Sequence, residues 1–580
     1  MFMLQAASRP PSSRDSPKLC PEKTRSELEL SQEHGLPPPE YTPSLHRSLR
    51  SYREQHKHVG EPAGKQHAKQ EGEKKSAAKK MSILFRPRTS ILDYTELMYQ
   101  GSDTIRGLVT CFWTIVGAYL VSILASHYER NGELLSGDLA VLLTSRGKDL
   151  LLSDLALVAS TFFVVPFVRL LWAGSWQPYF LDPRNSSCAI ALHAAVEVSW
   201  LVFWYGWQGT RGWPWTQRCF FSLHTAVNWM KIHSYLSTNR HLACVLRNKE
   251  DRLRGRGSCK EAGEEIQEEI KELDAQLCPY SNARFPQTLT THNYFMFQLC
   301  PTLVYELEYP RTPRIRWLYV AEKMAGTAGI FIVFYVVVAH LMIPHLERMS
   351  QTGVLMTTVH LMGPMATCWL LFFFITFDSI SNGFAELTRF ADRRFYDDWW
   401  NARGLDEFSR KWNRPVHLFL ARHIYMPIRD NWRIYKSSER SDTSKEKNKP
   451  KTKRAVGRFV RHLRINIPAP MAAMAATFFF SSILHEVTVV VACHRWNHGV
   501  LFFSQMMQIP LIFASDKMMW YKNQHALRNW IFWLVMVFFQ PFLLCLYTYN
   551  AFVAREDSAL TTTIAPSVNS QASLEKTAVF

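Results

Sequence analysis

Two parts of the sequence combine ionisable and hydrogen-bonding side chains in a way that permits chemistry. The first is His485, which stands inside the apolar run MAAMAATFFFSSILHEVTVVVA, with Glu486 beside it and Ser481 one helical turn earlier on the same face. A neutral imidazole in that position can act as a general base towards a hydroxyl group. Equally, a buried histidine can simply bond a neighbouring helix, so both interpretations stay open. Other apolar runs carry comparable groups: His193, Glu197, His224, His340 and His360.

The second part is the aromatic and polar stretch FYDDWWNARGLDEFSRKWNRPVHLFLARHIY, from Phe395 to Tyr425. Tryptophan and tyrosine gather where a bilayer meets water, so an interfacial belt explains this composition as well as a reaction site does. An amide such as that of Asn413 can donate to a developing oxyanion without transferring a proton. Arg410 can hold phosphate oxygens, although a cytosolic arginine is more often only a determinant of topology.

Long apolar runs must position these two parts. Seven of them are near the roughly 20 residues that span a bilayer, and two shorter runs are weaker candidates. The seven cover residues 108–124, 151–172, 188–207, 325–343, 354–377, 472–491 and 531–549, and the weaker two cover 213–232 and 500–514. We therefore expect an all-α, polytopic membrane protein of about nine transmembrane helices.

Composition and charge divide the chain further. Residues 1–100 are rich in Ser, Pro, Lys, Glu and His, and we expect them to form a disordered cytosolic tail. Residues 101–555 are expected to form the membrane domain, followed by a lumenal tail over 556–580. The formal net charge of +18 does not indicate nucleic acid, because the basic residues concentrate in the tail and in loops beside apolar runs.

The distribution of Lys and Arg also predicts two large cytosolic loops, over 237–316 and 380–469. Within the first, residues 261–277 carry apolar side chains at helical spacing among many glutamates, which predicts an amphipathic surface helix. Within the second, residues 437–454 are charged and poor in apolar side chains, which is typical of a flexible basic insertion. The 11 cysteines are scattered singly, without a spacing suited to zinc, so we expect neither a disulfide framework nor a metal.

Several segments together resemble the membrane-bound O-acyltransferase family. FYDDWWN, from Phe395 to Asn401, matches the FYxDWWN motif of the family's sterol and diacylglycerol acyltransferase branch. The further matches are PTLVYELEYPRTPRIRW at 301–317, RKWNRPVH at 410–417, SSILHE at 481–486 and QMMQIPL at 505–511. In order and type these segments look most like fungal sterol O-acyltransferases, and the resemblance covers about residues 85–555.

The resemblance implies that His485 is the catalytic membrane histidine and Asn413 the catalytic-site asparagine. It implies acyl-CoA contacts at Arg410, Asn413, His417, Tyr425 and Ser481. Glu407 is a departure, because it stands where an animal relative has an asparagine that contacts acyl-CoA. A second departure is that the basic contact expected before the run 472–491 falls near Pro470.

The resemblance also implies a supporting role for the motif itself. Its side chains are expected to form a folded lip beside the site, in which Asp398 and Asn401 bond backbone groups. The motif residues concerned are Phe395, Tyr396, Asp398, Trp399, Trp400 and Asn401.

The activity that the resemblance implies is direct transfer of a long-chain fatty acyl group from acyl-CoA to the 3-hydroxyl of a sterol, ergosterol or a cholesterol-like compound. No cofactor is implied, because acyl-CoA is a co-substrate. A multi-pass protein of the endoplasmic reticulum membrane is implied, with a cytosolic N-terminus and a homodimeric or homotetrameric assembly. Three alternatives are a diacylglycerol acyltransferase, which shares the motif, a transporter with intramembrane His and Glu, and a regulator that binds sterol without turnover.

Overall fold

The computed structural model describes residues 85–93, 103–132, 145–173, 187–256, 263–278, 283–433, 467–493, 499–517 and 524–563. Within these residues the regular elements are helices, and the only β contacts are two isolated bridges, from Arg88 to Asp392 and from Arg311 to Phe390. The described part of the chain is therefore all-α, as the apolar runs predict. The predicted insertion at 437–454 lies outside the described residues.

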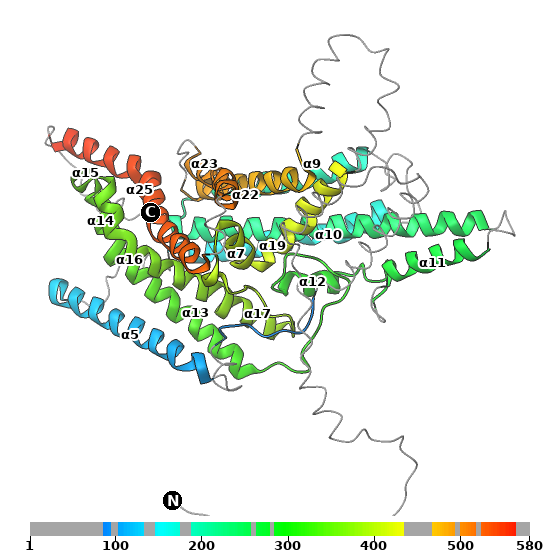
Figure 1. The fold of residues 1–580 in the computed structure, drawn as a ribbon, viewed down its shortest axis with the longest axis horizontal. Coiled ribbons are helices and arrows are strands. Elements are labelled where there is room, and N and C mark those ends of the chain that lie inside the picture. The colour runs from blue at the N-terminus through cyan, green and yellow to red at the C-terminus, as the bar shows by residue number, and fades with distance from the viewer. Residues whose placement is uncertain are drawn as a thin grey trace, which may run out of the picture. The chain divides into compact units, whose positions relative to one another are not determined.

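The helices follow one another along the chain with short π-helical (η2, η4, η5, η7) and 3₁₀ (η1, η6) turns between them (Figure 1). The first half contains α5 Asp103–Asn131, α7 Gly147–Ser160, η1 Thr161–Phe163, α8 Val164–Val168, η2 Arg169–Ala173, α9 Ser187–Gly209, α10 Trp215–Arg256, α11 Gly263–Leu277 and α12 Thr291–Leu299. Next come α13 Trp317–Val337, η4 Val338–Met342, α14 Ile343–Glu347, α15 Met349–Thr352, α16 Val354–Phe373, η5 Phe374–Ile380 and α17 Ser381–Leu387. The last elements are η6 Trp399–Asn401, α18 Leu405–Lys411, α19 Arg414–Leu420, η7 Ala421–Tyr425, α22 Ala469–Cys493, α23 Val500–Met506, α24 Gln508–Lys517 and α25 His525–Thr563.

Six helical segments of the described chain are long and apolar enough to cross a membrane. They are Gly147–Trp172, Cys188–Gly209, Trp317–Glu347, Val354–Leu387, Ala469–Ala492 and His525–Tyr549, and each contains one of the seven predicted long runs. The remaining long run, 108–124, lies in the 29-residue helix α5, which is not among the six. The weaker run 500–514 forms a shorter apolar helix. The expected total of about nine spans thus stays a prediction.

The other weak run, 213–232, belongs to α10, a 42-residue helix that packs against α9, α11 and α22 (Figure 1). This helix buries polar side chains, and Lys231 shows how the structure compensates for them. Its Nζ donates hydrogen bonds of 2.8 to 3.0 Å to the carbonyl oxygens of Phe297, Gln298 and Cys300 at the end of α12. The ammonium therefore satisfies carbonyls that a helix C-terminus leaves without partners.

Residues 85–93 fall within the tail expected from composition and yet are packed against the membrane domain. The Arg88 guanidinium forms two hydrogen bonds, of 2.9 and 2.6 Å, to the buried carboxylate of Asp392. Asp93 is fully buried and accepts a 2.9 Å hydrogen bond from Lys323 Nζ. The packed part of the chain thus begins earlier than the predicted boundary near residue 100.

The predicted surface helix at 261–277 is present as α11, whose described residues begin at Gly263. Leu277 is buried in the core, and Arg252 of α10 pairs with Glu269 at 3.0 Å. At the other end of the chain, α25 packs along α16 and extends to Thr563 (Figure 1). Helical structure therefore continues into the segment 556–580 that was expected to be a tail.

Candidate active site

His485 is held on α22 by its own helix. Its Nδ1 lies 2.8 Å from the backbone oxygen of Ser481, whereas the Ser481 hydroxyl is farther away, at 3.5 Å. A carbonyl oxygen can only accept, so Nδ1 must carry the hydrogen, and a neutral ring then has its lone pair on Nε2. Because the side chain is exposed on α22, Nε2 can accept a proton from an incoming hydroxyl group.

The neighbouring Glu486 makes a different contact. Its Oε2 accepts a 3.0 Å hydrogen bond from the backbone N–H of Phe502, in the first turn of α23. A carboxylate at a helix N-terminus satisfies one of the free N–H groups there and is favoured by the helix dipole. Glu486 Oε1 is buried and has no hydrogen-bond partner among the described residues. Glu486 therefore joins α22 to α23 and positions the helix that carries His485.

Asn413 begins α19 as its N-cap. Its Oδ1 accepts a 3.1 Å hydrogen bond from the backbone N–H of Val416, and Pro415 follows in the first turn, where proline is favoured. Because a backbone N–H can only donate, this bond fixes which end of the amide is oxygen. The Nδ2 hydrogens then point away from the cap and are oriented donors, as an oxyanion would require.

The side chains of α18 form ion pairs around the predicted acyl-CoA contacts. Arg410 pairs with Asp406 at 3.1 Å and its side chain is 47% exposed. Glu407 is held by Arg403 at 3.0 Å and by Lys411 at 2.8 Å. Burial alone would raise the pKa of Glu407, but hydrogen bonds from these two bases lower it to about 2. Glu407 is thus a paired anion, while Arg410 presents an accessible positive charge.

His417 and Tyr425 follow Asn413 on α19 and η7. Burial, with the nearby charges of Arg410 and Arg414, lowers the pKa of His417 to about 4, so this imidazole is neutral near pH 7. Burial also raises the pKa of Tyr425, and the Arg429 guanidinium lies 5.9 Å from the centre of its ring. Both side chains are therefore uncharged hydrogen-bonding groups on the helical segment that Asn413 begins.

The FYDDWWN motif is a packed junction between elements far apart in the sequence. Trp399 is buried, with ring centres 4.8 Å from Trp369 and 4.9 Å from Trp412. The backbone oxygen of Trp400 accepts hydrogen bonds from Asn529 Nδ2 at 2.9 Å and from Trp533 Nε1 at 3.1 Å. These contacts fit a supporting role for the motif, because they fasten α25 and α16 to the segment that leads into α19.

Two of the motif's polar residues bond differently from the expectation. The Asn401 backbone N–H donates to the Asp398 carbonyl at 3.0 Å, but the side chains do not bond backbone groups. Within the described part of the chain, the side-chain partners are instead Lys411 Nζ, which pairs with the Asp398 carboxylate at 3.1 Å, and Asn401 Nδ2, which donates a 3.4 Å hydrogen bond to it. At the start of the motif, Phe395 is buried, and the Tyr396 hydroxyl accepts a 2.9 Å hydrogen bond from the Leu92 N–H.

The elements that carry His485 and Asn413 pack against one another. Helix α22 contacts η7, the continuation of α19, and Phe480 of α22 shares an apolar cluster with Val416 and Phe419. Ser481 and His485 form one group on α22, while the remaining predicted contacts form a second group on α18, α19 and η7. Within the described part of the chain, no hydrogen bond or ion pair joins the two groups, so a substrate placed between them would provide the link.

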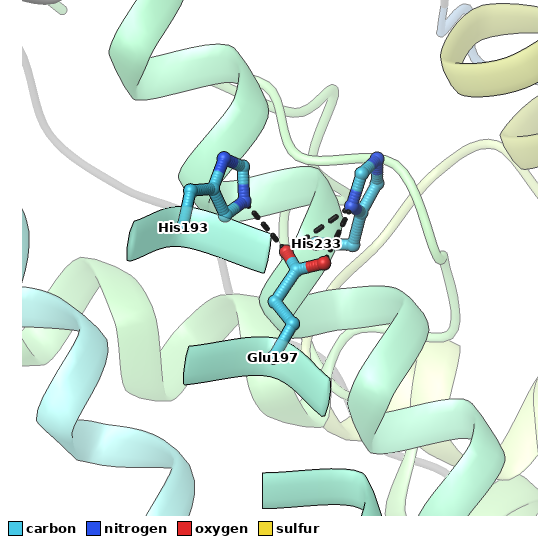
Figure 2. A group of neighbouring side chains, drawn as sticks. All are labelled: His193, Glu197 and His233. Atoms are coloured by element: carbon cyan, nitrogen blue, oxygen red, sulfur yellow. Dashed lines mark hydrogen bonds and ion pairs between the residues drawn. The ribbon is translucent and has the colours of Figure 1, made fainter. Parts of the chain in front are cut away.

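A third polar cluster brings together two residues of α9 and one of α10, which the sequence did not show to be neighbours. Figure 2 shows His193 and Glu197 of α9 beside His233 of α10. The four-residue spacing of the first two residues was a usable signal, because it places both on one helix face inside an apolar run. Nothing in the local pattern indicates that a residue 36 positions later completes the group.

The model of the membrane-bound O-acyltransferase family matches residues 197–438. Sterol O-acyltransferase 2 of Saccharomyces uvarum is 29% identical over 475 residues, which is 77% of this chain and 66% of that protein. Sterol O-acyltransferase 2 of Candida albicans is 27% identical over 510 residues, 78% of this chain and 76% of that protein. Diacylglycerol O-acyltransferase 1 of Dictyostelium discoideum is 32% identical over 282 residues, 47% of this chain and 39% of that protein.

The family match includes the FYDDWWN motif and Asn413, and the similarity to the two fungal proteins extends over about three quarters of the chain. The six apolar helical segments agree with a protein that is bound in a membrane. Over residues 197–438 the chain is similar to the membrane-bound O-acyltransferase family.

Proposed function

We propose that the chain is a sterol O-acyltransferase, which transfers a long-chain fatty acyl group from acyl-CoA to the 3-hydroxyl of a sterol and so forms a steryl ester for storage. The observation that carries the proposal is the extent of the similarity. Relatives named sterol O-acyltransferase match 77% and 78% of the chain, whereas the diacylglycerol O-acyltransferase matches 47%. The chain spans only 66% of the Saccharomyces uvarum relative, so the activity of that whole protein is a proposal for this chain.

His485 serves as the general base in this proposal. Its Nε2 takes the proton of the sterol hydroxyl while that oxygen attacks the thioester carbonyl carbon. The C–S bond then breaks, and the proton passes to the sulfur of coenzyme A. A positioned base of this kind contributes about 10²–10⁴ in rate. The bond from Nδ1 to the Ser481 carbonyl supports the role, because it leaves the lone pair on the outer nitrogen.

Asn413 stabilises the charge that develops during the attack. Its Nδ2 hydrogens donate to the thioester oxygen, and one such donor contributes about 10²–10³ in kcat. Arg410 holds phosphate oxygens of coenzyme A, since its side chain is 47% exposed. Coenzyme A is polar and the sterol is apolar, so the first substrate enters from the cytosolic loops and the second laterally from the lipid.

The proposed setting is the endoplasmic reticulum membrane, with the N-terminus in the cytosol and with two or four copies in the assembly. The concentration of Lys and Arg in the predicted cytosolic loops supports this orientation. With the N-terminus in the cytosol and spans at 108–124 and 151–172, the loop 173–186 also faces the cytosol. We therefore expect no glycan on the sequon Asn185-Ser186-Ser187 in cells. A glycan on Asn185, detected as a mass shift that endoglycosidase removes, would show that this loop faces the lumen and would contradict the proposed orientation.

The decisive experiment supplies the purified full-length protein with labelled oleoyl-CoA and, in separate reactions, ergosterol, cholesterol or diacylglycerol. Steryl ester is the expected product, and its rate of formation should fall by about 10²–10⁴ in the His485→Ala variant. Triacylglycerol as the only product would overturn the sterol assignment and favour the activity of the Dictyostelium relative. Sterol binding without any ester would instead favour a regulator.

A further inference from the structure

Three side chains that the proposed reaction does not use converge between α9 and α10 (Figure 2). His193 Nε2 lies 2.6 Å from Glu197 Oε1, and His233 Nδ1 lies 3.1 and 3.0 Å from the two Glu197 oxygens. One ligand atom from each residue can be chosen so that all three lie within 4.8 Å of one another. The group therefore offers two imidazole nitrogens and one carboxylate oxygen to a common point.

The surroundings make an unpaired carboxylate costly at this place. The side chains of His193 and Glu197 are 9% and 8% exposed, and both lie in the candidate span Cys188–Gly209. Among the described residues, the Glu197 carboxylate is hydrogen-bonded to the two imidazoles, which can each donate one N–H when neutral. With both imidazoles neutral, such bonds satisfy the carboxylate oxygens but leave the negative charge uncompensated, and an uncompensated charge inside a membrane costs several kcal/mol.

We propose that His193, Glu197 and His233 bind a divalent transition-metal ion, with zinc as the best match. Two histidines and one glutamate are a known zinc ligand set, usually with a water in the fourth position. Imidazole suits zinc and its neighbours in the first transition row, whereas magnesium and calcium prefer oxygen ligands alone. The ion would supply the positive charge that the carboxylate lacks.

The geometry can accept the ion with small movements. Zinc bonds of about 2.0–2.2 Å place tetrahedral ligand atoms about 3.3 Å apart, so the nitrogen–oxygen separations of 2.6 to 3.1 Å need to widen by about 0.2–0.7 Å. The two histidine nitrogens, which lie within 4.8 Å of one another, need to come to the same spacing. Both rings must present a lone pair to the ion. Each therefore carries its proton on the nitrogen that faces away, which is a change of tautomer without net proton release.

Packed side chains hold two of the ligands in place. The ring of Trp172 meets His193 edge-on at 5.7 Å, and the ring of His423 meets His233 at 5.2 Å. His423 itself is engaged with Ser234, whose hydroxyl lies 2.9 Å from its Nε2, so it lines the site without joining the ligand set. The ion would clamp α9 to α10, and this role does not depend on the proposed acyl transfer.

The test uses untagged, full-length protein purified in detergent without chelators. Elemental analysis should find about one zinc per chain. After the metal is stripped, titration with Co²⁺ should produce the visible absorption of a tetrahedral site, and it should raise the melting temperature. Wild-type protein that holds no zinc and gives neither Co²⁺ signal would overturn the proposal, even if the enzyme is active.

Variants locate the site within the molecule. Glu197→Gln keeps the shape and a hydrogen-bond acceptor but loses the anionic ligand, and His233→Gln removes one nitrogen ligand. Each should weaken Co²⁺ binding at least tenfold. His224→Gln is the matched control, because His224 also stands on α10 and contacts a carboxylate, Asp154, at 2.6 Å, but lies outside the cluster. Unchanged Co²⁺ binding by folded Glu197→Gln would place the ion elsewhere and refute the site.

Discussion

The amide of Asn413 has one observed function, as a helix cap, and one proposed function, as an oxyanion donor, and substitutions can separate the two. Its Oδ1 caps α19 through the Val416 N–H at 3.1 Å, and its Nδ2 is the proposed donor to the thioester oxygen. Loss of an N-cap to alanine typically costs about 1 kcal/mol of stability. Loss of one oxyanion donor costs about 10²–10³ in kcat. Aspartate caps a helix as well as asparagine does but has no N–H to donate.

Asn413→Asp should therefore keep the melting temperature of the unsubstituted protein and lose about 10²–10³ in kcat. Asn413→Ala should lose the same rate and in addition about 1 kcal/mol of stability. The assay measures ester formed per folded enzyme at saturating oleoyl-CoA and ergosterol, beside thermal unfolding.

Thr290→Ala is the control for the cap alone. Thr290 caps α12 through the Asn293 N–H at 3.1 Å, so its loss should lower stability by about 1 kcal/mol without changing kcat. If Asn413→Asp turns over as fast as the unsubstituted enzyme, the donor role is wrong and Asn413 only begins a helix.

Three further predictions concern other residues. His485→Ala should lower kcat by about 10²–10⁴ while acyl-CoA binding, measured directly, persists, and normal turnover would exclude a general base at this position. Arg88→Ala should lower the free energy of unfolding by about 3 kcal/mol, because it leaves the buried Asp392 carboxylate without its ionic partner, and a double variant with Asp392→Asn should recover part of that loss. His417 has a folded-state pKa of about 4, below its ordinary 6.5, so its stabilising contribution is complete above pH 6.5 and is lost as the pH falls towards 4. The melting temperature should fall less steeply over this interval in His417→Gln, and an unchanged slope would contradict the buried neutral imidazole.

The sequence predicts the elements whose stability depends on local pattern. Each of the six candidate spans contains one of the predicted long runs, because about 20 apolar residues in succession have few other stable environments. The helix α11 was predictable for a similar reason, since its apolar residues repeat at helical spacing and the last of them, Leu277, is buried. In both cases the signal lies within a single segment.

Contacts between distant segments are where prediction from sequence fails. Residues 85–93 were grouped with the tail before them, and the partners Asp392 and Lys323 explain why they are packed instead. Helix α10 is too polar on average to be recognised as a core helix, but its Lys231 is satisfied by carbonyls more than 60 positions away. For the same reason, the sequence does not show that His233 of α10 lies beside His193 and Glu197 of α9. Polar residues in the core are thus interpretable only once their partners are known.

The two proposed catalytic side chains share one mode of support. His485 uses Nδ1 to bond the carbonyl of Ser481, and Asn413 uses Oδ1 to bond the N–H of Val416. In each residue one end is fixed by the backbone of its own helix, and this determines the chemistry of the other end: a lone pair on Nε2, hydrogens on Nδ2. The orientation of each group thus depends on its helix rather than on a mobile side-chain partner. The distance between base and donor is then set by how α22 packs against η7, through an apolar cluster in which Phe480 and Phe419 both pack against Trp229. Substitutions that shift this packing should lower kcat without touching either catalytic group, since a small misplacement of reacting groups is enough to slow transfer.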